Sequence, residues 1–250
     1  MALYAYQKVV STPRKKAIGY ISYMSLTIGA LLLFWSLYPV LSFEIYSKVF
    51  IQPGVTSPVP RSETTSSLEQ ANSVLGSYNI FSNNLRDFTQ ASLWFPSTAD
   101  SQPTRVSSVT EYYLSIPKLN IKDAHVDVGG EDLTNSLVQY LPRSIPGEYG
   151  NAVVFGHSTL PQLYNVKDYK TIFTYLPSLE KGDKIDVKIG TDVYEYEVYD
   201  MFVVKPEQIS VLDEQNDGSY LTLITCVPPG TYWNRLVVKA KMKTLAAKSN

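Results

Sequence analysis

Tyr220-Leu221-Thr222-Leu223-Ile224-Thr225-Cys226 reads as one buried β-strand, rich in aliphatic and β-branched residues and stopped by Val227-Pro228-Pro229-Gly230. A second strand-like stretch follows and opens with an arginine, Arg235-Leu236-Val237-Val238-Lys239-Ala240. Upstream, Asn151-Ala152-Val153-Val154-Phe155-Gly156 has the same character and leads into His157. A thiol, a guanidinium and an imidazole therefore each lie at the edge of a predicted strand, where a rigid sheet can hold side chains for nucleophilic chemistry.

The β pattern extends over the whole C-terminal half of the chain. Alternation of apolar and polar residues is clearest in Val193–Tyr199. Short helices are predicted at Asp132–Tyr140 and Ile172–Leu179. The pattern favours a mainly β fold, a closed or nearly closed antiparallel-rich barrel with short helices, over a doubly wound sheet. The predicted strands are Tyr112–Ile116, Ala124–Val128, Ala152–Phe155, Lys184–Ile189, Val193–Val204, Leu221–Thr225 and Leu236–Lys241.

Charge and cysteine content exclude several classes of function. The 250 residues carry 22 Lys and Arg against 23 Asp and Glu, a net charge of −1, whereas nucleic-acid binding normally needs a basic face. The single cysteine, Cys226, cannot form an internal disulfide, and zinc sites built on cysteine pairs need at least two. Cys226 is therefore expected to act as a free thiol.

The chain begins with a predicted membrane anchor. No charged residue occurs in the stretch 17–43, and an apolar helix over residues 18–42, rising ~1.5 Å per residue, is long enough to cross a hydrocarbon core of roughly 30 Å. On the far side of this stretch the opposite charges of Glu44 and Lys48 nearly cancel. The positive-inside rule then predicts that residues 1–17 are cytoplasmic and that the rest lies outside the cell. A cleaved signal peptide is the alternative, although the stretch is long for one. The basic residues before the stretch are Lys8, Arg14, Lys15 and Lys16.

Composition divides the remainder of the chain into three parts. Residues 43–110 are rich in Ser, Thr, Pro and Asn and are predicted to form an extracellular stalk that is partly disordered. Within it, Leu93-Trp94-Phe95-Pro96 is too apolar to stay in water, so this segment is expected to dock on the domain or, alternatively, to gate its site. Residues 111–243 are the predicted catalytic barrel, and residues 244–250 are a C-terminal tail.

A cysteine nucleophile needs a neighbour that lowers its pKa or accepts its proton. His125 lies in a polar, alternating strand and is expected to be an exposed or edge residue, whereas His157 ends an apolar strand with its ring free in a loop. The sequence therefore favours His157 as the base. A hairpin between two strands would bring Arg235 close to Cys226, where a fixed cation can stabilise an oxyanion. Each residue also has a purely structural interpretation, because a lone cysteine is usually a small buried apolar residue.

Three motifs resemble those of the sortases, membrane-anchored cysteine transpeptidases of mostly Gram-positive bacteria. They are Thr222-Leu223-Ile224-Thr225-Cys226, the downstream Arg235-Leu236-Val237-Val238 and the upstream Phe155-Gly156-His157-Ser158. The resemblance covers about residues 112–242. It implies an eight-stranded sortase-type β-barrel with short helices, preceded by a single N-terminal transmembrane helix, which agrees with the fold class predicted from the strand pattern.

The resemblance also implies roles for single residues. Cys226 corresponds to the nucleophile that attacks the Thr–Gly bond of an Leu-Pro-x-Thr-Gly-like sorting signal and forms a thioester. His157 corresponds to the general acid and base, and Arg235 to the arginine that steadies the substrate and its oxyanion. Thr225 corresponds to a residue that contributes to substrate contacts.

The partners implied by the resemblance are secreted proteins with such a signal, an amine on the envelope or on a pilin-like protein, and the lipid bilayer. No nucleic acid, no cofactor and no metal is predicted. Two departures separate the chain from members that carry a lid and a C-terminal membrane helix. Trp94-Phe95-Pro96 lacks an Asp-Pro-aromatic triplet, and Lys241–Asn250 forms no apolar helix.

Two other functions stay open from the sequence. One is a cysteine peptidase or hydrolase with water as the acceptor, and the other is a non-catalytic, membrane-tethered β-barrel that serves as a binding module. The resting protonation state is open as well: Cys226 and His157 could be a neutral pair or a thiolate with an imidazolium.

Overall fold

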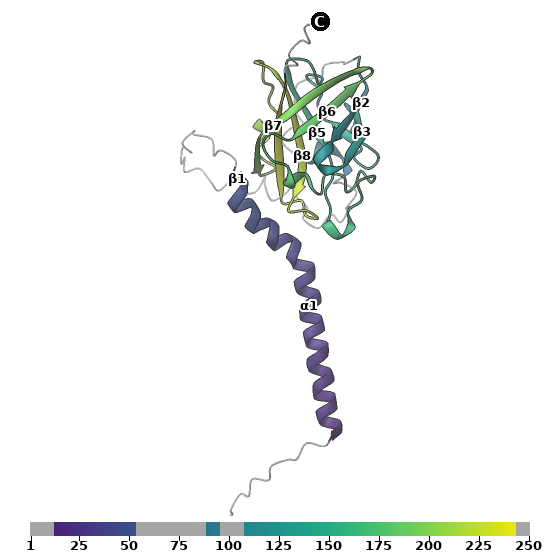
Figure 1. The fold of residues 1–250 in the computed structure, drawn as a ribbon, viewed down its shortest axis with the longest axis vertical. Coiled ribbons are helices and arrows are strands. Elements are labelled where there is room, and N and C mark those ends of the chain that lie inside the picture. The colour runs from purple at the N-terminus through teal and green to yellow at the C-terminus, as the bar shows by residue number, and fades with distance from the viewer. Residues whose placement is uncertain (1–12, 54–88, 96–107, 244–250) are drawn as a thin grey trace, which may run out of the picture. The chain divides into compact units, whose positions relative to one another are not determined.

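The computed structural model describes residues 13–53, 89–95 and 108–243 (Figure 1). It divides the chain into two units, residues 1–42 and residues 43–250. The first unit contains most of helix α1 (Pro13–Phe50), in which Lys16–Val49 includes a window with a mean hydropathy of 1.8. Among the described residues, this is the one helix that is long and apolar enough to cross a membrane. The predicted tail lies outside the described residues.

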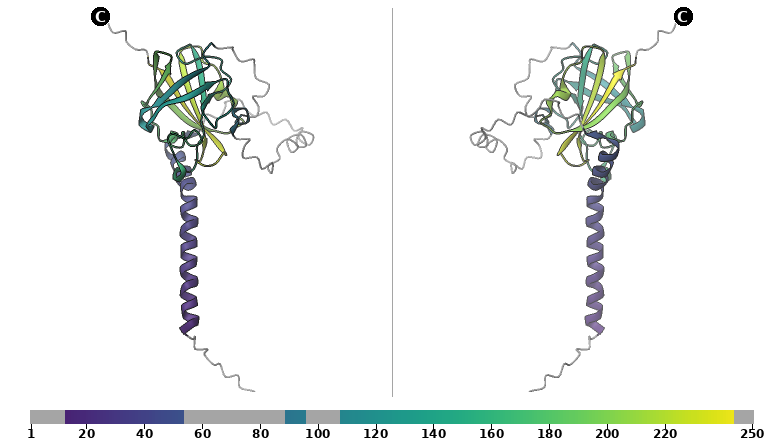
Figure 2. Two further views of the ribbon diagram at one scale, coloured as in Figure 1. Left: turned by 90° about the vertical axis from the view of Figure 1, so that its right-hand side faces the viewer. Right: turned by 90° about the vertical axis from the view of Figure 1, so that its left-hand side faces the viewer.

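The second unit is a β-barrel, as the strand pattern predicted. Within the described part of the chain, β2 to β9 pair in the order β7-β6-β2-β3-β4-β5-β8-β9, and a β7–β9 pairing closes the ring (Figure 2). The strands are β2 (Glu111–Ile116), β3 (Ile121–Val128), β4 (Leu137–Gln139), β5 (Gly150–Phe155), β6 (Lys184–Ile189), β7 (Asp192–Val204), β8 (Ser219–Val227) and β9 (Asn234–Met242). Short 3-10 helices are η2 (Ala91–Leu93), η4 (Pro117–Leu119), η5 (Pro161–Leu163), η6 (Leu176–Ser178) and η7 (Ile209–Leu212).

The helix predicted over Asp132–Tyr140 is wrong. The Asp132 carboxylate accepts a hydrogen bond from the Thr134 amide at 2.8 Å, and such a local turn competes with helix formation. Residues Leu137–Gln139 then form β4, which pairs in parallel with β3. At Ile172–Leu179 the chain forms turns and the single turn η6 rather than a longer helix.

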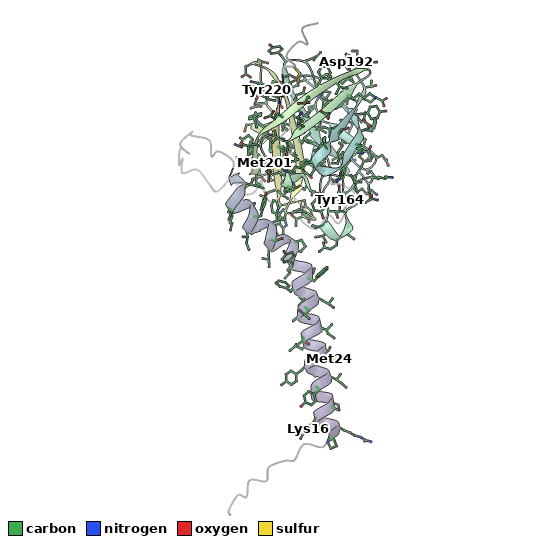
Figure 3. All side chains as sticks on the ribbon, viewed as in Figure 1. Lys16, Met24, Tyr164, Asp192, Met201 and Tyr220 are labelled. Atoms are coloured by element: carbon green, nitrogen blue, oxygen red, sulfur yellow. The ribbon has the colours of Figure 1, made fainter. Side chains whose placement is uncertain are left out.

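Strands β5 and β8 and the stretch 235–238 of β9 are buried on both of their faces. Successive side chains of a strand point to opposite faces, so Leu223 and Val238 enter the barrel core while Ile224 and Val237 point outward. Figure 3 shows the side chains of the described residues as sticks on the ribbon. The outward-facing residues form a second apolar cluster, which we call the outer cluster: Ala91, Trp94, Phe95, Leu133, Val138, Val153, Phe155, Val204, Val211, Ile224, Cys226 and Val237.

The first residues of the predicted stalk belong to the barrel instead. Phe43 and Ile51 are buried in the barrel core, and Tyr46 packs against it. Strand β1 (Gln52–Pro53) then pairs in parallel with Phe202–Val203 of β7. Helix α1 thus continues past the predicted end of the anchor at residue 42 because its last turns have apolar partners in the barrel.

A second part of the predicted stalk, residues 89–95, also packs on the barrel; we call it the cover segment. The Ala91 amide donates to the Glu131 carbonyl, and the Leu133 amide donates to the Thr89 carbonyl, both at 2.9 Å. Trp94 and Phe95 are fully buried in the outer cluster. This confirms that the apolar segment docks on the domain. The rest of the predicted stalk, residues 54–88 and 96–107, lies outside the described residues.

Candidate active site

The strand register places the three sequence-predicted residues side by side. Strand β5 runs parallel to β8 with Phe155 opposite Ile224, so His157 follows β5 at the level of Cys226, the next-to-last residue of β8. On the other side of β8, Cys226 pairs directly with Arg235 of β9. Neighbouring strands lie about 4.8 Å apart. The backbone register therefore places Cys226 between His157 on one side and Arg235 on the other.

The β5–β8 ladder is continued past its last paired residues by hydroxyl groups. The Gly156 amide donates to the Ile224 carbonyl at 3.1 Å. The Thr225 hydroxyl then donates to the Gly156 carbonyl at 2.7 Å, and the Ser158 hydroxyl donates to the Cys226 carbonyl at 2.6 Å. The residues on both sides of His157 are thereby tied to the end of β8.

Trp94 of the cover segment contacts both neighbours of the thiol. Its ring lies 5.5 Å from the His157 ring and 5.4 Å from Cζ of Arg235. It also stacks on Phe155, with ring centroids 5.3 Å apart. Trp94 and Cys226 belong to the same outer cluster, in which Cys226 retains only 7% of its accessible surface.

Arg235 is held by backbone carbonyl groups. One terminal nitrogen donates to the Tyr232 and Asn234 carbonyls, at 3.0 and 3.3 Å, and the other donates to the Trp94 carbonyl at 3.1 Å. The side chain is 2% exposed, and its Nε has no hydrogen-bond partner among the described residues. A buried guanidinium that binds carbonyl oxygens is suited to hold the carbonyl of a peptide in the same place.

Burial keeps His157 neutral while the cover segment is in place. Desolvation lowers the pKa of His157 to about 4, with Asp132 and Asp168 opposing the shift and Lys170 reinforcing it. The ring nitrogen Nε2 is buried and has no partner within the described part of the chain. It can therefore accept a proton once a donor comes into reach.

Burial also acts on the thiol. It raises the pKa of Cys226, and the nearby Arg235 charge only partly offsets this rise. Both groups are thus driven toward their uncharged forms, which favours the neutral pair over a thiolate with an imidazolium in this closed arrangement.

The lowered pKa of His157 predicts that acid opens the cover segment. With the pKa at about 4 in the closed state and near its usual ~6.5 when exposed, the open state binds more protons between these values. The stabilisation of the closed state is complete above pH ~6.5 and is lost as the pH falls toward 4. At pH 5 the open fraction should be about 30-fold higher than at pH 8. Hydrogen exchange of the Ala91 and Leu133 amides, corrected for intrinsic rates, measures this change.

In the variant His157→Gln the same amides should lose this pH dependence, because the titrating group is gone. A wild-type protection factor that does not fall between pH 8 and pH 5 would contradict the closed-state pKa.

Gly156 lets the loop with His157 approach the barrel core. A Cβ atom at this position would collide with the Phe173 ring and would lie 2.6 Å from Cδ2 of Leu137. We expect Gly156→Ala to reduce the free energy of unfolding by about 1–3 kcal/mol, as overpacking of a core does. Urea denaturation measures this loss. Gly218→Ala is the matched control, because there a Cβ lies no closer than 3.3 Å to its neighbours, the Lys241 side chain and the Tyr220 ring.

The structure also locates two other residues that the sequence singled out, Thr225 and His125. The Thr225 side chain is fully buried and donates to Gly156, so in this structure it contacts the His157 loop and not the open surface where a substrate would arrive. His125 lies on β3 and pairs with Glu111 at 2.9 Å, away from the thiol. Its side chain is partly exposed, as predicted, but β3 pairs with β2 and β4 and is not an edge strand. Among the described residues, no group of three or more His, Cys, Asp or Glu side chains could hold a metal ion.

Sequence reasoning missed the positions of two residues at the site. It predicted that the segment containing Trp94 docks or gates, but not that Trp94 contacts His157 and Arg235. The sequence shows four apolar residues, Leu93-Trp94-Phe95-Pro96, within a polar stretch. This pattern indicates that the segment packs on something, but not which surface it contacts. Ser158 was quoted only as part of a motif, and its hydrogen bond to Cys226 depends on the register of two distant strands.

A model of the sortase domain matches residues 114–243, which include the second half of β2 and all of the later strands. The chain belongs to the sortase family. Together with the closed barrel, this match confirms the predicted sortase-type fold. Within this sortase, Cys226, His157 and Arg235 all fall inside the matched region.

Known sortases show how far the likeness extends. Sortase D of Bacillus subtilis is 28% identical over 116 residues, which are 46% of this chain and 53% of that protein. Sortase A of Streptococcus agalactiae is 32% identical over 74 residues, or 30% of each chain. The chain thus spans about half the length of the Bacillus relative.

Similar solved structures are also sortases. A Clostridium perfringens Sortase D5 transpeptidase has 23% identity and a TM-score of 0.46, covering 64% of this chain and 92% of that one. Sortase C-1 from Actinomyces oris has 28% identity and a TM-score of 0.45, covering 56% and 76%.

Proposed function

We propose that this sortase is a cysteine transpeptidase that cleaves an Leu-Pro-x-Thr-Gly-like sorting signal and joins the new carboxyl end to an amine. The observation that supports this best is the register of β5, β8 and β9, which aligns His157, Cys226 and Arg235 at one end of the barrel. The family membership makes a transpeptidase the natural assignment for this arrangement.

In the proposed reaction, the Cys226 sulfur attacks the carbonyl carbon of the Thr–Gly bond while its proton passes to His157. Arg235 donates hydrogen bonds to the oxyanion of the tetrahedral intermediate. His157 then gives its proton to the departing glycine amine, which leaves a thioester on Cys226. An incoming amine attacks the thioester, its proton goes to His157 and from there to the sulfur, and the new peptide bond forms as the thiol is restored.

This proposal requires the cover segment to move. The Trp94 carbonyl occupies one terminal nitrogen of Arg235, and the Trp94 ring occupies the space beside His157. A peptide that enters the site must therefore replace both contacts. We propose that the cover segment is a lid, that the donor peptide displaces it, and that the exposed His157 and Cys226 then move toward their usual pKa values.

The proposed location is the cell membrane, with a cytoplasmic N-terminus and the barrel outside. An apolar helix near the N-terminus and the family both support an anchored protein, and the basic residues before the helix support the orientation. The proposed partners are secreted proteins with a sorting signal and an amine on the envelope or on a pilin-like protein.

Mass spectrometry of the full chain in detergent, incubated with a short Leu-Pro-x-Thr-Gly peptide, tests the proposal. We expect a thioester adduct on Cys226 that disappears when an amine such as triglycine is added, with a peptide–amine product. The variant Cys226→Ala is the control and should give neither. A hydrolysed peptide with no amine product would favour the peptidase, and no adduct under any condition would favour the non-catalytic binding module.

A further inference from the structure

Ser158 forms one of the shortest hydrogen bonds near the candidate site. Its hydroxyl lies 2.6 Å from the carbonyl oxygen of Cys226, a residue 68 positions away in the sequence. The loop that carries Ser158 is fixed on its other side too, since the Phe173 amide donates to the His157 carbonyl at 2.9 Å. The Thr159 amide donates to the Thr174 hydroxyl at 3.0 Å. The backbone around His157 is therefore held from two directions.

The bond lies where the backbone ladder between the two strands has ended. The last paired residues are Phe155 and Ile224, followed by the bond from the Gly156 amide to the Ile224 carbonyl. Beyond this point, hydroxyl groups supply the cross-strand bonds, first from Thr225 and then from Ser158. The Ser158 bond is the one that reaches the carbonyl of Cys226 itself.

We propose that Ser158 is a positioning residue that fixes the separation between the Cys226 sulfur and the His157 ring. Its hydroxyl does not react, but it holds the backbone of the nucleophile against the residue next to the base. A displacement of about 1 Å between reacting groups can cost up to 100-fold in rate. This inference rests on the proposed function, because it assigns Ser158 to the proton transfer between those two side chains.

The test compares Ser158→Thr with Ser158→Val, two side chains of nearly equal size of which only threonine has a hydroxyl. We expect the threonine variant to keep kcat within about twofold of the wild type. We expect the valine variant to lose about tenfold in kcat with little change in KM, because a positioning contact between two protein segments acts on the proton transfer rather than on peptide binding. Ser178→Ala is the matched control, since it removes a 2.7 Å serine-to-carbonyl bond that only links residues three apart.

A second readout does not depend on peptide turnover. In a Trp94→Ala background, where the cover segment no longer limits access, iodoacetamide alkylation of Cys226 at neutral pH should be about tenfold slower with Ser158→Val. It should approach the rate of His157→Ala, because the imidazole no longer meets the thiol. If the wild type turns over no sorting peptide, the proposed function fails, but this comparison still tests Ser158.

Three results would overturn the proposal. Equal kcat values for the threonine and valine variants would mean that the hydroxyl has no part in positioning. A loss confined to KM would assign Ser158 to peptide binding. Unchanged or faster alkylation in the valine variant would show that the His157–Cys226 pair does not depend on this bond.

Discussion

Replacement of Trp94 by alanine is expected to raise the alkylation rate of Cys226 by iodoacetamide about 100-fold at pH 7. Trp94 is fully buried, stacks on Phe155 and contacts the His157 ring. Removal of a buried tryptophan side chain reduces stability by roughly 3–5 kcal/mol. Here the removal destabilises the closed state of the cover segment relative to the open state. About 3 kcal/mol of this reduction corresponds to a 100-fold larger open fraction. Peptide cleavage should rise in parallel until opening no longer limits the rate.

The matched control is Leu93→Ala in the same segment. Leu93 is 42% exposed, so its removal takes little buried area from the closed state and should leave the alkylation rate within about twofold. Equal rates for the wild type and Trp94→Ala would mean that the thiol is reached without movement of this segment. A faster alkylation with slower peptide cleavage would assign Trp94 to substrate binding rather than to a lid.

The barrel could be predicted from the sequence because most of its strands have a residue pattern that is recognisable within the strand itself. Each long strand, such as Ser219–Val227, is rich in residues suited to a buried sheet. Strand β4 consists only of Leu137–Gln139. The spacing of apolar residues in and before it also fits a helical turn, so the hydrophobic periodicity alone could not distinguish a strand from a helix. The pairing with β3 that settles it is a non-local contact.

The positions of three candidate site residues at strand ends could also be predicted from the local sequence. Cys226, His157 and Arg235 stand at strand ends, and strand ends are visible in a sequence. The cover segment was not, because residues 89–95 dock through Trp94 and Phe95 on a surface that exists only after β5, β8 and β9 have paired. For the same reason, the sequence could not show that burial under Trp94 lowers the pKa of His157.

Arg235→Ala is expected to change two measurements in opposite directions. Amide exchange of Ala91 and Leu133 should become about tenfold faster, because the charged hydrogen bond to the Trp94 carbonyl is lost; such bonds contribute about 1.5–3 kcal/mol. Transfer of the sorting peptide to an amine should fall about 10²–10³-fold, as when one oxyanion donor is removed from other enzymes. Arg235→Lys should recover part of the first effect but little of the second, since an ammonium lacks the planar fork.

Lys241→Ala, on the same strand, is the control for the loss of a positive charge and should change neither measurement. The pair of readouts separates the contact of Arg235 with the Trp94 carbonyl from the role that we propose for Arg235 in the reaction. If exchange became faster while transfer stayed at the wild-type rate, Arg235 would be only the clamp that holds the cover segment. If amide exchange and peptide transfer both became faster, the guanidinium would slow the reaction by holding the site closed. Backbone amides would then have to donate the hydrogen bonds to the oxyanion. Faster amide exchange together with slower peptide transfer is the one result that supports both roles. Arg235 would then bind the backbone carbonyl of Trp94 in the closed state and a backbone carbonyl of the donor peptide during the reaction.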